Sequence, residues 1–373
     1  MPVVLLHGPR QSGRTSLARS VAEPAGYGFL TFDADNLQAA ARSDPVGFVA
    51  VLPPRMVMDE IQRIPEIFTS IKTVVDQHRM PRRFPLTGSS SVLLLPRLAD
   101  CLAGRIEPQR LNPQAQCEIE RRPSGFVNQL FDAGFKLSKH DRLGMDMARI
   151  GGLHALPRLL EFAAAQTTHL FNASDLAGPL QISRPTIRDY ITLLERVFLL
   201  ELLPPWHLRQ PGRLVKTPKI HPTDTGLTSA LLRVEAAALH KDRALLNQLM
   251  ETLVFQKLRQ QASWEADPIA FSHSRDRDDH AVDIVLERSI HALAGVEAKA
   301  SGTIRESDFR GLRKLQQIAG DRLNCGVVPY DGETTARFAD DLFAVPISPL
   351  WETKVVEPSP EFSARRGTGR ARR

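Results

Sequence analysis

The chain has 373 residues, of which 42% are hydrophobic and 24% are charged, and a chain of this length builds two or three packed domains. No apolar stretch approaches the roughly 18 residues that a membrane-spanning helix needs, and the apolar start of the chain lacks the basic lead and cleavage site of a secretory signal. Cys101, Cys117 and Cys325 are too few and too scattered for a disulfide framework or a thiol zinc site. The sequence therefore predicts a cytoplasmic protein with no membrane segment.

The net charge of +6 is concentrated at the C-terminus. The chain holds 48 Lys and Arg against 42 Asp and Glu, but five of the arginines lie in residues 363–373, which contain no acid, so 43 basic residues remain for the rest. Because that remainder is nearly neutral, composition indicates no extended surface for nucleic acid. The basic tail, 353–373, is predicted to be solvated and disordered, the alternative being an arm that binds nucleic acid.

Short apolar strands alternate with helical stretches at the start of the chain. Strands are predicted at 3–6, 28–32, 56–58 and 83–87, and this alternation is typical of a parallel sheet covered by helices. The string that follows the first strand precedes a helix predicted over 16–22, so it has both the spacing and the context of a P-loop. Its residues are Gly8, Pro9, Arg10, Gln11, Ser12, Gly13, Arg14 and Thr15.

The residue types of this string suit phosphate binding. Glycines let backbone N–H groups wrap closely around phosphates, and the following helix presents its positive end to them. Thr15 is predicted to bind Mg²⁺. The usual lysine is here Arg14, whose planar guanidinium keeps the charge but not the compact shape of an ammonium. The string therefore predicts binding of ATP with Mg²⁺, while hydrolysis is either retained, slowed or lost.

Two later strand ends add residues to the predicted nucleotide site. The third strand ends in Asp59 and Glu60, which would hold the Mg²⁺ shell and polarise the attacking water; acids that merely precede a helix are the alternative. Thr87 and Ser89 end the fourth strand and either sense the γ-phosphate or form a turn. Arg105 is predicted either to reach the phosphate of a neighbouring subunit in a homo-oligomer, as an arginine finger, or to form a surface salt bridge.

The middle segment, 139–234, is predicted to be helical and then strand-like. Ser183 precedes a proline and is predicted to cap a helix that runs to residue 196. This helix would occupy the recognition position of a winged helix. Residues in its first turns would then contact DNA in a groove, the alternative being a module that packs or binds a partner protein. They are Arg184, Thr186 and Arg188.

The last segment, 235–352, has the pattern of a metal-dependent nuclease. A helix is followed by strand, strand, helix and strand. Glu297 and Lys299 are two apart in a predicted strand and so point to one face, and Asp283 lies in the strand before. Two carboxylates for a divalent cation, with an ammonium to orient water or phosphate, suit phosphodiester hydrolysis. Glu251 would complete the metal ligands Asp283 and Glu297, whereas an ion pair between Glu297 and Lys299 is the alternative.

Several of these strings together resemble one family. They are the P-loop, Asp-Glu-Ile-Gln from Asp59, Thr-Gly-Ser-Ser from Thr87, and Leu-Ala-Gly-Arg ending at Arg105. The chain resembles, over nearly its whole length except the tail, prokaryotic AAA-type P-loop ATPases with a C-terminal domain of unknown function that is like the PD-(D/E)XK nucleases. This resemblance implies ATP binding and a prokaryotic cytoplasm, but no established substrate. The chain departs from the family at Arg14, at Arg82, where glycine is usual, and in lacking a helical segment before the first strand.

The sequence as a whole predicts an α/β fold in four parts. These are an AAA-type P-loop domain with a parallel sheet (1–138), a winged-helix-like domain (139–234), a PD-(D/E)XK nuclease-like α/β domain (235–352) and the tail (353–373). The nucleotide state of the first would control the winged-helix and nuclease-like half. Three alternatives stay open: a Mg²⁺-dependent nuclease of defence or DNA repair that ATP licenses, a non-catalytic nucleotide-sensing regulator that binds DNA or protein, and a decayed copy without catalysis.

Overall fold

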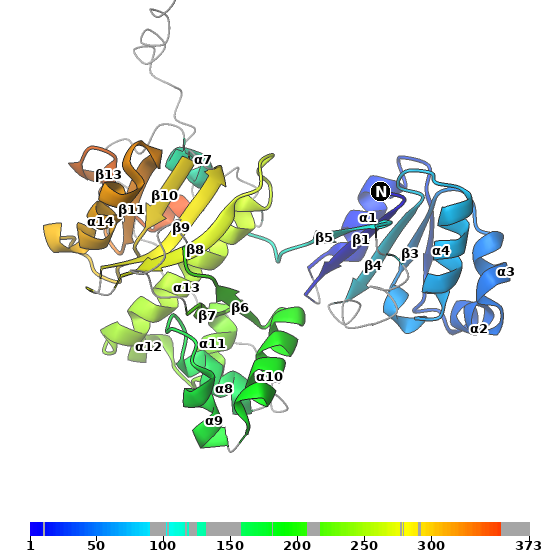
Figure 1. The fold of residues 1–373 in the computed structure, drawn as a ribbon, viewed down its shortest axis with the longest axis horizontal. Coiled ribbons are helices and arrows are strands. Elements are labelled where there is room, and N and C mark those ends of the chain that lie inside the picture. The colour runs from blue at the N-terminus through cyan, green and yellow to red at the C-terminus, as the bar shows by residue number, and fades with distance from the viewer. Residues whose placement is uncertain are drawn as a thin grey trace, which may run out of the picture.

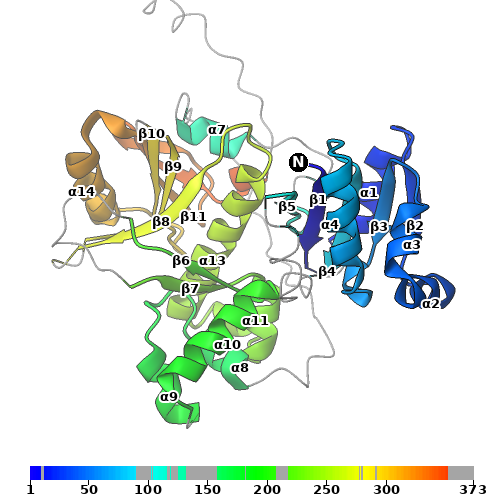
Figure 2. The same cartoon turned by 45° about the vertical axis from the view of Figure 1, so that its right-hand side comes forward.

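A computed structural model describes residues 1–9, 12–89, 102, 104–115, 118, 125–131, 158–180, 182–206, 217–276, 278, 280–289 and 292–351. Figure 1 shows them as three parts: an N-terminal α/β part in blue, a largely helical middle part in green, and a C-terminal α/β part in yellow and orange. Figure 2 shows the same three parts after a rotation of 45°. The predicted tail, Arg10, Gln11, Cys101 and Cys117 lie outside the described residues.

The N-terminal part contains a parallel sheet of five strands in the order β2-β3-β4-β1-β5. The four predicted strands are confirmed, with ends that differ from the prediction by up to two residues. The strand β5 was not predicted, because its sequence IEPQR has one apolar residue and a proline. The strands are β1 (Val3–Gly8), β2 (Gly28–Thr31), β3 (Met56–Asp59), β4 (Phe84–Ser89) and β5 (Ile106–Arg110).

Helices cover both faces of this sheet. In β3, Val57 packs with Ala18 and Ala22 of the first helix, whereas Met58 packs in the core that holds Ile71 of the fourth, because successive strand residues point to opposite faces. The predicted helix after the P-loop is confirmed. The helices are α1 (Arg14–Ala22), α2 (Asp35–Ser43), α3 (Pro45–Ala50), α4 (Ile67–Gln77) and the single 3₁₀ turn η1 (Ile61–Arg63).

The middle part has helices first and a two-stranded antiparallel sheet after them. Ser183 caps its third helix as predicted, since its Oγ accepts a hydrogen bond of 3.3 Å from the backbone N–H of Thr186. The inner faces of the helices and Ile220 of the sheet form one apolar core. The elements are α8 (Arg158–Ala165), α9 (Ala173–Leu180), α10 (Arg184–Arg196), β6 (Leu200–Leu203), β7 (Lys219–Pro222) and α11 (Thr225–Leu231).

The C-terminal part is built on a mixed sheet of six strands in the order β12-β13-β11-β10-β9-β8. Three strands precede the second long helix, not the two predicted. The strands are β8 (Ala270–Arg275), β9 (Ala281–Ser289), β10 (Ala292–Val296), β11 (Leu323–Tyr330), β12 (Ala336–Ala339) and β13 (Leu342–Pro346). The helices are α12 (Ala236–Leu239), α13 (Arg243–Ala262), α14 (Arg310–Ala319) and the 3₁₀ turns η3 (Glu306–Phe309), η4 (Gly320–Arg322) and η5 (Ser348–Leu350).

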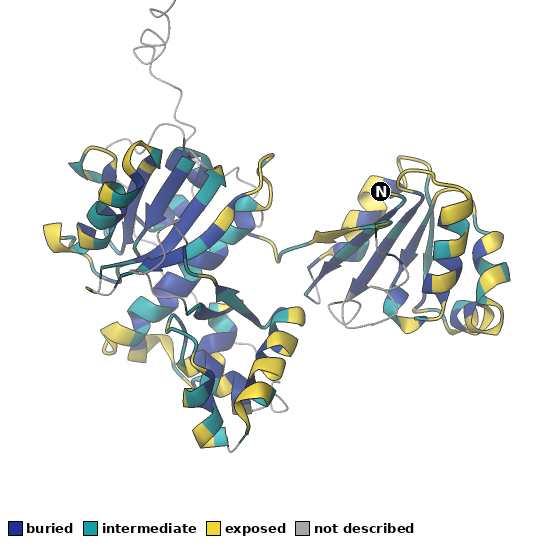
Figure 3. Cartoon of the chain, viewed as in Figure 1, coloured by how far each residue is buried: buried dark blue, intermediate teal, exposed yellow. Residues whose placement is uncertain are grey.

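One face of this sheet packs against α13 and the other against α14, so its strands are buried along most of their length (Figure 3). The helix α7 (Phe126–Phe131) falls in the segment assigned by sequence to the P-loop domain, yet its apolar side chains pack in the same core as α13. The chain therefore enters the C-terminal part before the middle part begins. No helix in the described ranges is long and apolar enough to span a membrane.

Candidate functional site

The described residues of the turn between β1 and α1 suit a phosphate site. Gly13 has φ 80°, a left-handed conformation that side chains with a Cβ rarely adopt. A Cβ on Gly8 would lie 2.3 Å from the carbonyl oxygen of Leu111, so only glycine fits there. The hydroxyl of Ser12 is buried and has no hydrogen-bond partner within the described part of the chain, and an unpaired buried donor of this kind fits a phosphate oxygen.

Three strand and helix ends meet at one carboxylate beside this turn. The Oγ1 of Thr15 donates a hydrogen bond of 3.0 Å to Oδ1 of Asp59, and the Oγ1 of Thr87 donates to the same oxygen. The backbone N–H of Glu60 donates to Thr87 Oγ1 over 3.3 Å. A hydroxyl beside a carboxylate next to a phosphate turn is a ligand pair that suits Mg²⁺.

Glu60 has a backbone conformation that costs free energy. Its φ is 54°, which for a residue with a side chain costs roughly 1–3 kcal/mol, and strain of this kind clusters at functional sites. Its carboxylate accepts a hydrogen bond from Nε2 of Gln62. The carboxylate of Glu60, which is predicted to polarise water, thus lies in a strained turn directly after β3 and beside Asp59.

Arg14 lies inside the fold, with its side chain fixed to the sheet. It is buried, and its Nη1 donates a hydrogen bond to the carbonyl oxygen of Gly88 in β4. Its charge therefore stays at the P-loop, but part of its donor capacity is already used by the protein. The neighbouring Ser89 ends β4, and its side chain lies outside the description.

Arg105 forms an ion pair within its own domain. Its Nε and Nη2 lie 2.5 and 2.9 Å from the two carboxylate oxygens of Asp76 in α4, and this contact lowers the pKa of Asp76. The salt bridge that sequence left as an alternative is thus formed. Arg82, where the resembled family has glycine, has φ 54°, which is the conformation that glycine adopts without strain.

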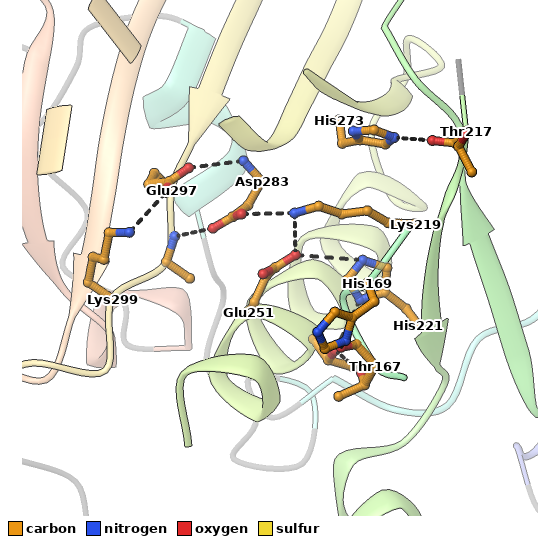
Figure 4. A network of polar contacts seen from close by, with 12 residues as sticks. Thr167, His169, Thr217, Lys219, His221, Glu251, His273, Asp283, Glu297 and Lys299 are labelled. Carbon is orange, nitrogen blue, oxygen red and sulfur yellow. Dashed lines mark hydrogen bonds and ion pairs between the residues drawn. The ribbon is translucent and has the colours of Figure 1, made fainter. Parts of the chain in front are cut away.

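A second cluster of charged groups lies in the C-terminal part (Figure 4). The backbone N–H of Asp283 donates to Oε2 of Glu297 over 3.1 Å, and Lys299 Nζ lies 3.0 Å from Oε1 of the same carboxylate. The backbone N–H of Ala298 donates to Oδ2 of Asp283 over 3.0 Å. The residues that sequence proposed for a nuclease centre, Asp283, Glu297 and Lys299, are therefore in contact.

Sequence reasoning missed the central member of this cluster, Lys219. Its Nζ lies 2.8 Å from Oε1 of Glu251 and 2.9 Å from Oδ1 of Asp283, and all three side chains are nearly fully buried. Lys219 belongs to β7 of the middle part, so the middle part supplies a cation to a site that the C-terminal part otherwise builds. A lysine in a short strand carries no signal of partners 32 and 64 residues away.

The charges of this cluster do not balance, and its pKa values reflect that. It holds three carboxyls against the ammoniums of Lys219 and Lys299. Burial, and then the charge of Asp283, raises the pKa of Glu251 to about 8 and that of Glu297 to about 7. Burial opposes the charge on Lys219, but attraction to Asp283 and Glu251 outweighs it and raises its pKa. The surplus carboxyl therefore retains a proton readily, and Lys219 stays charged.

An open pocket of about 330 Å³ is lined by Glu297 and Lys299. Asp278, His280 and Arg310 also line it. Among the described residues, the His, Cys, Asp and Glu groups whose ligand atoms lie within 4.8 Å of one another are Asp276, Asp278 and His280, not the predicted metal ligands Glu251, Asp283 and Glu297. Lys219, not an open space, lies between Glu251 and Asp283.

The N-terminal part contacts the middle part next to the P-loop. His7, the residue before Gly8, stacks on Phe198 with ring centroids 5.6 Å apart, and Arg110 of β5 lies over the same ring at 4.9 Å. Burial, and then the charges of Arg110 and Arg14, lowers the pKa of His7, so its ring stays neutral. Arg110 also lies 3.5 Å from Glu201 of β6. Through Arg110 of β5, the N-terminal part thus touches the sheet that carries Lys219.

Comparisons with known proteins assign a class to the first part. Residues 1–120 match the AAA domain model, residues 143–238 match a domain of unknown function (DUF8612), and residues 246–350 match another (DUF4143). With the parallel sheet and the turn at Gly13, the first match identifies the N-terminal part as an α/β domain of the P-loop AAA type. The other two matches are to domains without a described activity.

Two mycobacterial proteins are similar to nearly the whole chain. The uncharacterized proteins Rv2008c of Mycobacterium tuberculosis and Mb2031c of Mycobacterium bovis are each 29% identical to it over 378 residues, covering 95% of this chain and 82% of the relative. Their names state no activity.

Solved structures offer only distant overlap. The RuvB branch-migration motor of Thermotoga maritima has a TM-score of 0.26 at 14% identity, covering 63% of this chain and 88% of that one. The McrB–McrC half-complex of Thermococcus gammatolerans has a TM-score of 0.22 at 13% identity, covering 67% and 78%. Overlaps this low carry no functional argument.

Proposed function

We propose that the protein is an ATP-binding AAA-type protein whose nucleotide state controls its C-terminal half. The observation that carries this proposal is the meeting of Thr15, Thr87 and Asp59 at one carboxylate oxygen beside the turn at Gly13. Backbone N–H groups of the turn and the hydroxyl of Ser12 would hold the phosphates of ATP. Thr15 and Asp59 would bind Mg²⁺, which neutralises phosphate charge when bound.

The residues around this corner have separable roles. Glu60 would accept a proton from, and orient, an attacking water, while Thr87 fixes the Asp59 carboxylate and Glu60 by hydrogen bonds. Arg14 would supply positive charge from a fixed position at the end of β4. Because a guanidinium tied to a carbonyl follows a moving phosphate less freely than a lysine ammonium, turnover would be slower than binding suggests.

Replacing Arg14 by lysine is expected to raise the rate of ATP turnover by about tenfold or more, which corresponds to roughly 1.4 kcal/mol of activation free energy. The compact ammonium fits the phosphate cradle and releases the contact with Gly88. Phosphate release at saturating Mg²⁺-ATP measures the rate, and a fluorescent ATP analogue measures binding. Arg19→Lys, an exposed position on the same helix, is the matched control. If neither protein binds the analogue, the nucleotide proposal fails.

The contact between the first two parts supports control of the C-terminal half. His7 contacts Phe198, and Arg110 contacts both Phe198 and Glu201 of β6. β6 pairs with β7, which carries Lys219. Glu201 also lies 2.6 Å from Arg259 of α13. Phe198 has φ 59°, an outlier for an aromatic residue, and such strain supports a switching role for this contact.

Replacing Phe198 by alanine is expected to remove the coupling between ATP and the C-terminal half, which between linked sites is typically about 1–3 kcal/mol. In the wild-type protein, Mg²⁺-ATP should shift the urea midpoint reported by tryptophan fluorescence. In Phe198→Ala that shift should vanish. Tyr190→Ala, at a partly exposed ring of α10, is the control and should keep it. A shift that persists in Phe198→Ala contradicts the proposed route.

The middle part would be a winged helix that contacts DNA. Three helices followed by an antiparallel pair, α8 to β7, support this fold. Arg184 and Arg188 are exposed on α10, whereas the hydroxyl of Thr186 lies 2.7 Å from that of Ser183 in the helix cap. The two arginines are therefore better placed for a groove than Thr186 is.

A second candidate function is Mg²⁺-dependent cleavage of a phosphodiester. The contact of Asp283, Glu297 and Lys299, two of which line an open pocket, favours it. Nicking of a supercoiled plasmid that requires Mg²⁺ and falls at least about 100-fold in Glu297→Gln would support it. Glu306→Gln, an exposed carboxylate near the same pocket, is the control, and equal nicking by both variants would indicate a contaminant.

A further inference from the structure

We propose that Lys219 is a built-in cation that occupies the carboxylate site of the C-terminal half and keeps divalent cations out until β7 moves away. This inference rests on the second candidate function, since it assumes that Asp283 and Glu297 are able to bind a metal ion. It adds that the middle part, not the C-terminal part, decides whether they do.

The position of the ammonium carries the argument. Lys219 Nζ lies 2.8 and 2.9 Å from Glu251 Oε1 and Asp283 Oδ1, so it takes the oxygen atoms that a shared metal ion would need. The remaining oxygens of Asp283 and Glu297 accept from backbone N–H groups and from Lys299. With these donors in place, neither carboxylate is free to bind a metal ion (Figure 4).

The net charge of the cluster also indicates that Lys219 and a divalent cation exclude each other. With Lys219 present, three carboxyls face two ammoniums, and a divalent cation would turn the buried cluster positive. Without Lys219, the carboxyls face Lys299 alone, and the surplus of two negative charges is what a divalent cation neutralises. Because uncompensated buried charge is costly, the site should hold either Lys219 or a divalent cation, but not both.

The contacts of β7 are compatible with its movement away from the C-terminal part. Its alternate residues face opposite ways: Ile220 packs in the apolar core of the middle part, while Lys219 and His221 face the C-terminal part. Several contacts on that side are polar, since His221 Nδ1 lies 3.0 Å from Thr252 Oγ1 and His273 Nε2 lies 2.9 Å from the carbonyl oxygen of Thr217. His221 also packs against the ring of Phe255, with centroids 4.7 Å apart. Water can replace the polar contacts when β7 moves with the middle part, and the move would also separate His221 from Phe255.

The other groups packed around Lys219 add no competing carboxylate. Burial, and then the charge of Lys219, lowers the pKa of His221 and that of His273, to about 4 for His273, so both rings stay neutral. His221 Nε2 lies 3.9 Å from Glu251 Oε1, too far for a hydrogen bond. Lys219 is therefore the cation that holds Glu251 and Asp283 together.

The test is Mn²⁺ binding to the full chain, measured by the electron paramagnetic resonance signal of free Mn²⁺. All proteins carry Asp59→Asn, which removes the proposed metal ligand of the nucleotide site. Lys219→Met should bind one Mn²⁺ at least about 100-fold more tightly than the parent, which retains Lys219. This ratio of dissociation constants corresponds to roughly 2.7 kcal/mol of binding free energy. Lys241→Met, at an exposed lysine, is the matched control and should behave as the parent.

The outcomes distinguish the metal site itself from the role of Lys219 in excluding the metal ion. Equal Mn²⁺ binding by the parent and Lys219→Met, lost in both on adding Glu297→Gln, overturns the role of Lys219 and leaves the metal site standing. No binding by Lys219→Met overturns both. Binding by Lys219→Met that survives Glu297→Gln places the ion elsewhere and also overturns the proposal. If Lys219→Met does not fold, Lys219→Gln keeps a hydrogen-bond donor without the charge and is held to the same outcomes.

Discussion

Asparagine in place of Asp59 is expected to reduce ATP turnover at least about 100-fold and to abolish the gain in ATP affinity that Mg²⁺ gives, since a bound metal ion contributes several kcal/mol of charge stabilisation. Asn keeps the shape of the side chain, and its oxygen still accepts from Thr15 and Thr87. What it removes is the charge that would hold Mg²⁺. Turnover is measured in the Arg14→Lys background, where the rate should be highest, and affinity is measured by calorimetry with and without Mg²⁺.

The matched control is Asp35→Asn, an exposed carboxylate in the first turn of α2. It should change neither quantity by more than about twofold, because single exposed charges contribute little at this distance. A Mg²⁺-dependent affinity that persists in Asp59→Asn would contradict the proposed corner. It would also leave Glu60 without a metal-bound phosphate to act on.

The arrangement of Thr15, Asp59 and Thr87 was predictable because its signals are local. The P-loop string lies within one turn between a strand and a helix, and the pair Asp59-Glu60 ends the next strand but one, so the parallel sheet brings them to one edge without long-range information. Local backbone geometry also explains why glycine is usual at the position of Arg82, because its φ is positive. The partner of Arg105 was not predictable, because Asp76 is one of several exposed acids.

The carboxylate cluster was predictable only in part. Glu297 and Lys299 share a face because strand residues alternate, and a hairpin places Asp283 beside them. Lys219 belongs to the middle part. No periodicity or motif in a four-residue strand predicts contacts with residues of another part of the chain. The same holds for α7, whose apolar residues fit the core of either neighbour and pack with α13.

These contacts form one continuous chain of interactions. His7, the residue before Gly8, touches Phe198, and Arg110 contacts both Phe198 and Glu201 of β6. β6 pairs with β7, whose Lys219 contacts Asp283 in the carboxylate cluster. A movement of the P-loop strand relative to the middle part would therefore change the position of Lys219 in the carboxylate cluster, which lies apart from the proposed nucleotide site. Coupling of this kind is reciprocal, so a divalent cation in the cluster should in turn alter ATP affinity.

Methionine in place of Lys219, in the absence of divalent cations, is expected to destabilise the C-terminal half by about 3–5 kcal/mol, the usual cost of leaving a buried charge without its partner. Tryptophan fluorescence in urea isolates this half, because Trp206, Trp264 and Trp351 are the tryptophans of the chain and all follow the P-loop domain. The double variant Lys219→Met with Glu251→Gln removes one positive and one negative group together, and it should recover part of the loss as a coupling free energy. Lys241→Met should leave the midpoint unchanged. If Lys219→Met matches that control, Lys219 does not hold the cluster together, and its contacts with Glu251 and Asp283 are of no energetic consequence.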